Sequence, residues 1–192
     1  MRAYNGYKKG TPTQDAERLP ADGYVIRIMK AEEVTYQNGD TGLKLYFDID
    51  EGKYKGFYGK NYASQGEPKK WKGTYSFSTP NDDAEEKYKH TFENRIACIT
   101  ESNPNYEWDF NENTLEDKVV GAVFCNQEYD FDGKKGFFTK CVGLRTASAI
   151  RENKYKIPAD RFLDNSNNNA FPIGGSDENF TVSNEDSDDL PF

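Results

Sequence analysis

The sequence is poor in the residues that build most catalytic and metal centres. Its 192 residues include one histidine, His90, and three cysteines, Cys98, Cys125 and Cys141, with no Cys-x-x-Cys pair. A zinc site needs several such ligands close together, and a disulfide framework needs paired cysteines. The sequence also has no nucleotide-binding glycine loop and no serine or cysteine paired with a base. We therefore expect no enzyme, no bound metal and no cofactor.

Long apolar runs are also absent. Hydrophobic residues make up 35% of the chain, and none of their runs approaches the length of a membrane span. No signal peptide opens the sequence. Widely spaced cysteines in an odd number are typical of reduced thiols in a cytoplasm. We expect a cytoplasmic protein with no membrane partner.

Basic residues are missing from the last part of the chain. Residues 164–192 contain seven acids and no lysine or arginine. Residues 1–163 hold the other 26 acids and all 25 basic residues, so this part is near neutral at −1, and the tail carries −7 of the net −8. Because the tail is rich in asparagine, serine and glycine, it cannot bury enough apolar surface to order itself. We expect a disordered acidic tail.

What the chain does contain is a clear β-strand pattern. Apolar and polar residues alternate through residues 43–50, so one face of this strand is apolar. A short glycine-containing link leads into residues 57–62, and the two stretches together predict a β-hairpin. An earlier strand is predicted at 24–31, with its isoleucines pointing inward. The Asn-Gly turn at 37–40 connects it to the hairpin.

The second half of the body predicts one helix and two further strands. Apolar residues recur every three or four positions over residues 82–101, which indicates a helix with His90 off its apolar stripe. Strands are predicted at 119–129 and 137–147, joined by a glycine-containing turn whose Asp-x-Asp-Gly lacks the remaining ligands of a calcium loop. Both faces of the first of these strands carry apolar residues near 119–125. The pattern therefore leaves its buried face open.

The resulting order is strand, strand, strand, helix, strand, strand. It is the order of the five-stranded OB-fold, a small β-barrel that has its helix between strands 3 and 4 and binds oligonucleotides. We therefore predict a mainly β protein with a flexible arm over 1–18, an OB-fold domain with a basic C-terminal extension over 19–163, and the tail over 164–192. A β-grasp or another α+β domain can imitate this order.

Aromatic and basic side chains interleave on the polar face of the predicted hairpin and in the link that follows it. Single-stranded nucleic acid is bound by such mixtures, because bases stack on aromatic rings and phosphates pair with cations. Tyrosine is also a good strand former on a solvated face, and a tryptophan can equally plug a barrel. The predicted stacking residues are Tyr46, Tyr58, Tyr62, Trp71 and Phe137, and the predicted phosphate contacts are Arg27, Lys44, Lys60, Lys69, Lys70 and Lys135.

Residues 183–192, SNEDSDDLPF, resemble the acidic C-terminal tip of bacterial single-stranded DNA-binding proteins. In that family a run of acids closes on an aspartate, an aliphatic residue, a proline and a terminal phenylalanine. The body, from residues 19–24 onward, also resembles small replication-associated proteins of phages and mobile elements of Gram-positive bacteria. The family resemblance implies that the terminal phenylalanine enters an apolar pocket on a partner protein, while the acids meet a basic rim. The matching positions are Asp188, Asp189, Leu190, Pro191 and Phe192.

Together these features predict sequence-independent binding of single-stranded DNA in replication, recombination or repair, with the tip recruiting replication and recombination proteins. A homo-oligomer is compatible with this function. A near-neutral body implies a local basic track, with an affinity for DNA that depends steeply on salt. The alternative is a protein adaptor without DNA binding of its own, in which the barrel binds protein and the acidic tail recruits replication enzymes. An acidic DNA-mimic inhibitor is less well supported, because seven of the acids lie in the tail and not on the folded body.

Overall fold

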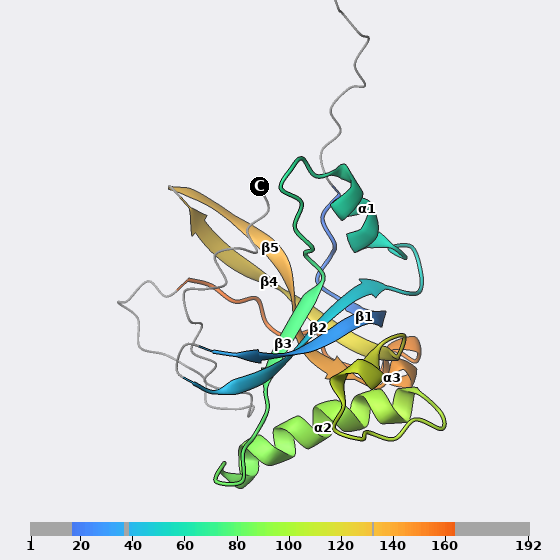
Figure 1. The fold of residues 1–192 in the computed structure, drawn as a ribbon. Coiled ribbons are helices and arrows are strands. Elements are labelled where there is room, and N and C mark those ends of the chain that lie inside the picture. The colour runs from blue at the N-terminus through green and yellow to red at the C-terminus, as the bar shows by residue number, and fades with distance from the viewer. Residues whose placement is uncertain (1–16, 37–38, 132, 164–192) are drawn as a thin grey trace, which may run out of the picture.

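The computed structural model describes residues 17–36, 39–131 and 133–163 (Figure 1). Within these ranges the chain forms a five-stranded antiparallel sheet, three α-helices and one 3-10 helix. In chain order the elements are β1 (Gly23–Thr35), β2 (Thr41–Ile49), α1 (Phe57–Ser64), β3 (Thr74–Ser78), α2 (Glu86–Ser102), the 3-10 helix η1 (Glu112–Leu115), β4 (Val119–Phe131), β5 (Lys134–Arg145) and α3 (Ala147–Arg151).

The sheet has the strand order β3-β2-β1-β4-β5, with β1 at its centre. Every pairing between neighbouring strands is antiparallel. Among the described residues, β3 and β5 are the two edges, so the sheet is open and not the closed barrel that the sequence predicted. The mainly β class is confirmed, and α2 follows β3 and precedes β4, as expected.

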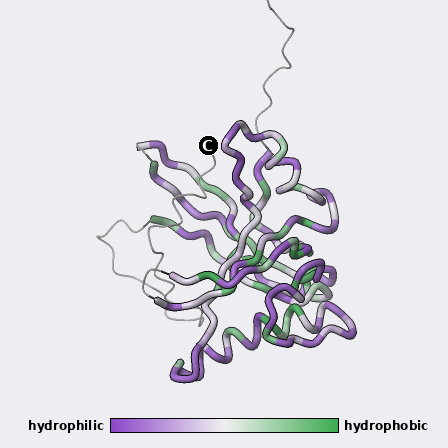
Figure 2. Tube along the Cα trace, viewed as in Figure 1, coloured by the Kyte–Doolittle hydropathy of each residue, from purple (hydrophilic) through white to green (hydrophobic). Residues whose placement is uncertain are grey.

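The alternation in residues 43–50 builds the main core. Leu43, Leu45, Phe47 and Ile49 are all buried, as the strand period predicted. The ring of Phe47 meets that of Phe124 from β4 at a centroid distance of 6.0 Å in an edge-to-face contact. Figure 2 shows the hydrophobic stretches gathered where the strands cross in the middle of the molecule.

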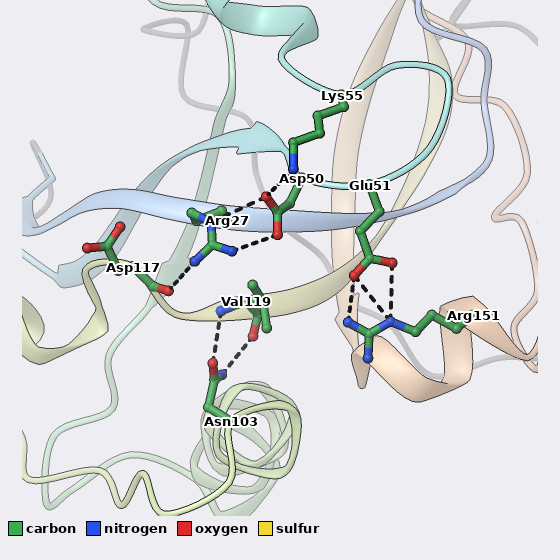
Figure 3. Close-up of polar contacts among 8 residues, drawn as sticks. All are labelled: Arg27, Asp50, Glu51, Lys55, Asn103, Asp117, Val119 and Arg151. Atoms are coloured by element: carbon green, nitrogen blue, oxygen red, sulfur yellow. Dashed lines mark hydrogen bonds and ion pairs between the residues drawn. The ribbon is translucent and has the colours of Figure 1, made fainter.

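The helix predicted over 82–101 is confirmed with a later start. α2 spans Glu86–Ser102 and places Ile96 and Ile99 in the main core. Its C-terminal end is tied to β4 by Asn103, whose amide nitrogen donates to the carbonyl of Val119 while its amide oxygen accepts from the Val119 N–H (Figure 3). This pair of hydrogen bonds copies the pairing between two antiparallel strands, and it fixes α2 against the start of β4.

Both faces of β4 are buried, which explains why the sequence pattern left the choice open. Val120, Ala122 and Phe124 belong to the main core. On the other face, Val123 packs with Val25 of β1 and with α3 in a second cluster, to which α3 contributes Ala147 and Ile150. Gly121 allows this close approach, because an added Cβ would lie 2.5 Å from Cγ1 of Ile150.

The strand predicted over 57–62 is wrong, because these residues begin the helix α1. Gly56 precedes the helix in the left-handed conformation, with φ of 71°, and turns the chain out of the β2 direction. The carboxylate of Asp48 then accepts the backbone N–H groups of Tyr58 and Gly59 in the first turn, at 2.8 and 3.0 Å. The third strand of the sheet is β3, in a stretch that the sequence pattern had treated as a loop.

Cys125 and Cys141 are buried, and Cys98 is half-buried. All three are free thiols. Burial raises the pKa of Cys141 to about 12, so this thiol stays protonated at neutral pH.

Replacing Asp48 by alanine is expected to destabilise the fold by about 0.5–2 kcal/mol, because the first turn of α1 loses its capping carboxylate. Asp48→Asn keeps one acceptor oxygen and should lose less. Urea unfolding followed by circular dichroism measures the difference. Glu116→Ala, at an exposed position, is the control. Equal stability of Asp48→Ala and the parent chain would contradict this role of Asp48.

Candidate nucleic-acid interface

The polar face of β1 and β2 carries a tyrosine between two lysines. The ring of Tyr46 lies 5.5 Å from the Nζ of Lys30 and 5.3 Å from the Nζ of Lys44. Its hydroxyl donates a hydrogen bond of 2.5 Å to a carboxylate oxygen of Glu32. Hydrogen bonds from Lys30 and Tyr46 hold the pKa of Glu32 below its usual range. The ring is therefore fixed in orientation and flanked by positive charge.

A second aromatic and basic cluster lies at the end of α1 and in the link to β3. The rings of Tyr62 and Trp71 are 5.7 Å apart, and the Nζ of Lys69 lies 5.6 Å from the centroid of the Tyr62 ring. Tyr62 is 38% exposed, so part of its ring is open to solvent. Lys70 is exposed beside this cluster. A base could stack on the open part of Tyr62 next to a cation.

The indole of Trp71 is held against the sheet by its N–H. Nε1 donates to the carbonyls of Phe47 and Gly73, at 3.1 Å in each case. Gly73 also accepts the backbone N–H of Phe47 at 2.8 Å, and an added Cβ on Gly73 would lie 2.2 Å from the Phe47 oxygen. This close approach requires glycine at position 73. Trp71 is thus half-buried and fixed against the sheet. Its role in base stacking stays a prediction.

Both clusters adjoin β2. Tyr46 lies on the strand, and Trp71 donates to the carbonyl of the next residue, Phe47. We call the combined set the basic–aromatic surface; it consists of Lys30, Lys44, Tyr46, Tyr62, Lys69, Lys70 and Trp71.

Sequence reasoning missed Lys30, because a β-bulge changes the phase of β1. The register steps from Ile28 opposite Phe47 to Lys30 opposite Tyr46, which leaves Met29 as an extra residue. Ile26 and Ile28 point inward as predicted, and strict alternation would also have turned Lys30 inward. No local sequence signal marks the bulge, so the position of Lys30 follows only from the pairing with β2.

Arg27 lies on the outer face as expected, but its guanidinium is engaged within the protein (Figure 3). Nη2 and Nε contact the two carboxylate oxygens of Asp50 at 2.8 and 3.3 Å, and Nη1 donates to the carbonyl of Asp117 at 2.9 Å. Lys55 adds a further contact to Asp50 at 3.4 Å. Burial alone would raise the pKa of Asp50, but hydrogen bonding and attraction from Arg27, with help from Lys55, lower it overall.

Tyr58 is a core residue, which corrects its assignment as a stacking residue. It is 6% exposed, and its ring packs edge-to-face on Phe47 at 5.5 Å. The reason is the helix: in α1, unlike in a strand, Tyr58 turns toward the core. Lys60 is exposed on α1, but residues two apart on a helix do not share a face, so Lys60 and Tyr62 point in different directions.

Lys135 and Phe137 lie on β5, which the strand order separates from β2 by β1 and β4. Lys135 pairs with Asp130 at 3.5 Å, and Phe137 packs edge-to-face on Phe162 at 5.8 Å. These two residues are therefore not part of the basic–aromatic surface. Figure 1 shows α1 and the end of the β4–β5 hairpin toward the top of the view, whereas α2 lies at the bottom.

The tip residues Asp188 to Phe192 lie outside the described residues, as do most of the predicted arm and the tail. His90 is exposed on α2. Within residues 17–36, 39–131 and 133–163, no three metal-ligating side chains gather into a cluster. None of the helices in the described part of the chain is long and apolar enough to cross a membrane.

No protein-family model and no curated protein matches the sequence.

Replacing Asp50 by asparagine is expected to reduce stability by about 1 kcal/mol at pH 7, because Arg27 loses its carboxylate partner. The folded-state pKa of Asp50 is lowered, so its contribution is present above the unfolded pKa of about 3.9 and is lost as pH falls through the folded-state value. The difference between Asp50→Asn and the parent should therefore shrink below about pH 4. Urea midpoints between pH 3 and pH 7 measure it.

The matched control is Glu51→Gln, which breaks the pair between Glu51 and Arg151 (Figure 3). Both side chains of that pair are well exposed, at 42% and 50%, whereas Asp50 is 15% exposed, so the control should lose less stability. A constant difference between Asp50→Asn and the parent at all pH values would contradict the charge interaction.

Proposed function

We propose that this protein binds single-stranded DNA without sequence preference through the basic–aromatic surface. The observation that carries the proposal is the half-open ring of Tyr62, packed beside Trp71 and under the ammonium group of Lys69. Such a platform suits any base, because every base has a π-face, and the neighbouring cation suits the phosphate that follows it.

The fold supports this assignment. The strand order β3-β2-β1-β4-β5, with α2 between β3 and β4, matches the order of the OB-fold, which is a partly open Greek-key barrel. We propose an OB-like domain whose outer face on β1, β2 and β3 receives the DNA. OB-folds bind oligonucleotides on this part of the sheet.

The binding would rely on a small number of rigid contacts. Trp71 is fixed by two hydrogen bonds, and Tyr46 by one, so little side-chain freedom is lost when a base stacks on them. Lys69, Lys70 and Lys44 supply the phosphate contacts. Because Arg27 is paired with Asp50, we assign it a structural role in this mechanism.

The acidic tip extends the proposal to partner proteins. The sequence of residues 188–192 matches the tip of bacterial single-stranded DNA-binding proteins, and we propose that it recruits replication, recombination or repair proteins while the sheet holds DNA. A single aromatic anchor can dominate such an interface, and the neighbouring acids speed the encounter with a basic partner.

A protein adaptor is the second candidate, and the charge balance favours it. Residues 1–163 carry a formal charge of only −1, and Lys30 of the basic–aromatic surface is paired with Glu32. A surface with so little net positive charge could serve a protein ligand as well as DNA.

Tyr62→Ala should weaken binding of a labelled oligo-dT by about 1–3 kcal/mol, or about 5- to 150-fold, because one base loses its stacking platform. Tyr88→Ala is the matched control, since Tyr88 is also exposed and also has a lysine, Lys87, over its ring. It lies on α2, away from the basic–aromatic surface. Fluorescence anisotropy at fixed salt measures both variants, and equal effects would argue against Tyr62 as a stacking residue.

Log affinity falls with log salt, and Lys69→Gln should make this slope less negative by about 0.7, because one phosphate contact is lost. Lys87→Gln on α2 should leave the slope unchanged.

Deleting residues 188–192 should not weaken binding if the tip serves partners. Failure of the full chain and the truncated chain to bind oligo-dT at low salt would exclude the DNA-binding function and select the adaptor.

A further inference from the structure

A groove of about 780 Å³ lies at the end of β2 that is distant from α1. α2 lines one side through Phe92 and Ile96, and β2 contributes Leu43. Leu43 is at the start of β2, whereas α1 is capped by Asp48 near the end of that strand. Leu43, which lines the groove, and Lys44 of the basic–aromatic surface are neighbours on β2, and their side chains point to opposite faces of the sheet.

Two aromatic residues on the link between α2 and η1 form the other wall. Trp108 and Phe110 both line the groove, with their rings 5.9 Å apart. Phe110 is 82% exposed and has a φ of 60°, a conformation that side chains other than glycine rarely adopt. The Nε1–H of Trp108 is buried and has no hydrogen-bond partner among the described residues. An exposed aromatic ring held in a strained backbone is typical of a binding site.

The rim of the groove is acidic. Glu33, Asp82, Glu93 and Glu112 line it, and Lys89 is the single basic residue among the described residues of the lining. Lys89 is itself engaged, with its Nζ 3.0 Å from the carbonyl of Asp82 and 3.4 Å from a carboxylate oxygen of Glu86. This charge disfavours DNA and the acidic tail, and it favours a cationic segment with apolar or aromatic side chains.

We propose that the groove holds the chain's own N-terminal segment, residues 1–10. This segment, MRAYNGYKKG, contains three basic residues, two tyrosines and no acid, whereas the tail over 164–192 contains seven acids and no base. Of the two terminal stretches outside the described residues, only the N-terminal one complements the rim in charge. Its tyrosines match the aromatic wall of the groove in chemistry.

The length of chain is sufficient for this contact within one molecule. The described part begins at Glu17, whose carboxylate pairs with Lys53 beyond the end of β2, at 3.0 Å. The groove lies at the start of β2, and a nine-residue strand spans about 26 Å. The ten residues from Glu17 back to Tyr7 reach about 33 Å when extended.

The test uses the indole N–H signals of the two tryptophans, Trp71 and Trp108, in a ¹⁵N-labelled protein. In a chain lacking residues 1–16, the Trp108 signal should move relative to the full chain, and a synthetic peptide of residues 1–10 should return it toward the full-chain position. The Trp71 signal serves as the internal control and should stay in place. A peptide of residues 183–192 should produce no shift.

Charge-reversal variants test whether the peptide binds at the groove or responds only to the net charge of the protein. Glu93→Lys on the rim should weaken peptide binding to the shortened chain about tenfold, whereas Glu116→Lys, exposed and outside the groove, should not. An identical Trp108 signal in the full and shortened chains, with no response to the peptide, would overturn the proposal. A Trp108 shift in the full chain that appears only at concentrations where the protein dimerises would overturn its intramolecular form. Neither outcome depends on DNA binding.

Discussion

The carboxylate of Asp48 is the contact on which the arrangement of the proposed DNA surface depends. It stands on the polar face of β2 and accepts the N–H groups of Tyr58 and Gly59 in the first turn of α1, so the helix starts soon after the strand ends. The neighbouring residue, Phe47, places its ring in the core and accepts the indole N–H of Trp71. Two adjacent residues of one strand therefore fix α1 and the link to β3, and with them the relative positions of Tyr62, Trp71 and Tyr46.

This dependence explains why a short helix forms from a weak helix sequence. α1 contains a glycine and an asparagine in eight residues, and its intrinsic helix propensity is low. It is stabilised by the capping carboxylate and by the packing of Tyr58 on Phe47, both of which β2 supplies. The sequence predicted a strand here because a short glycine-containing link joins this segment to β2, a pattern that is typical of a β-hairpin.

The basic–aromatic surface and the acidic groove both adjoin β2. Leu43 lines the groove and its neighbour Lys44 belongs to the basic–aromatic surface, and their side chains point to opposite faces of the sheet. A near-neutral body can therefore present a local cationic track to the proposed DNA ligand and a separate acidic site to a basic segment. The −8 net charge describes neither surface, since −7 of it belongs to residues 164–192.

The sequence by itself determined the mainly β class, the core face of β2, the helix α2 and the two long strands β4 and β5. In β2 and α2 the period of the apolar residues matches the period of the element, so local pattern and tertiary packing agree. In β4 a continuous apolar run predicted the strand, and both of its faces are buried. Only the tertiary structure decided the bulge at Met29, the helix α1, the burial of Tyr58 and the engagement of Arg27. The physical reason is that partners distant in sequence fix these features: β2 sets the phase of β1 and caps α1, and Asp50 and Asp117 position the guanidinium of Arg27.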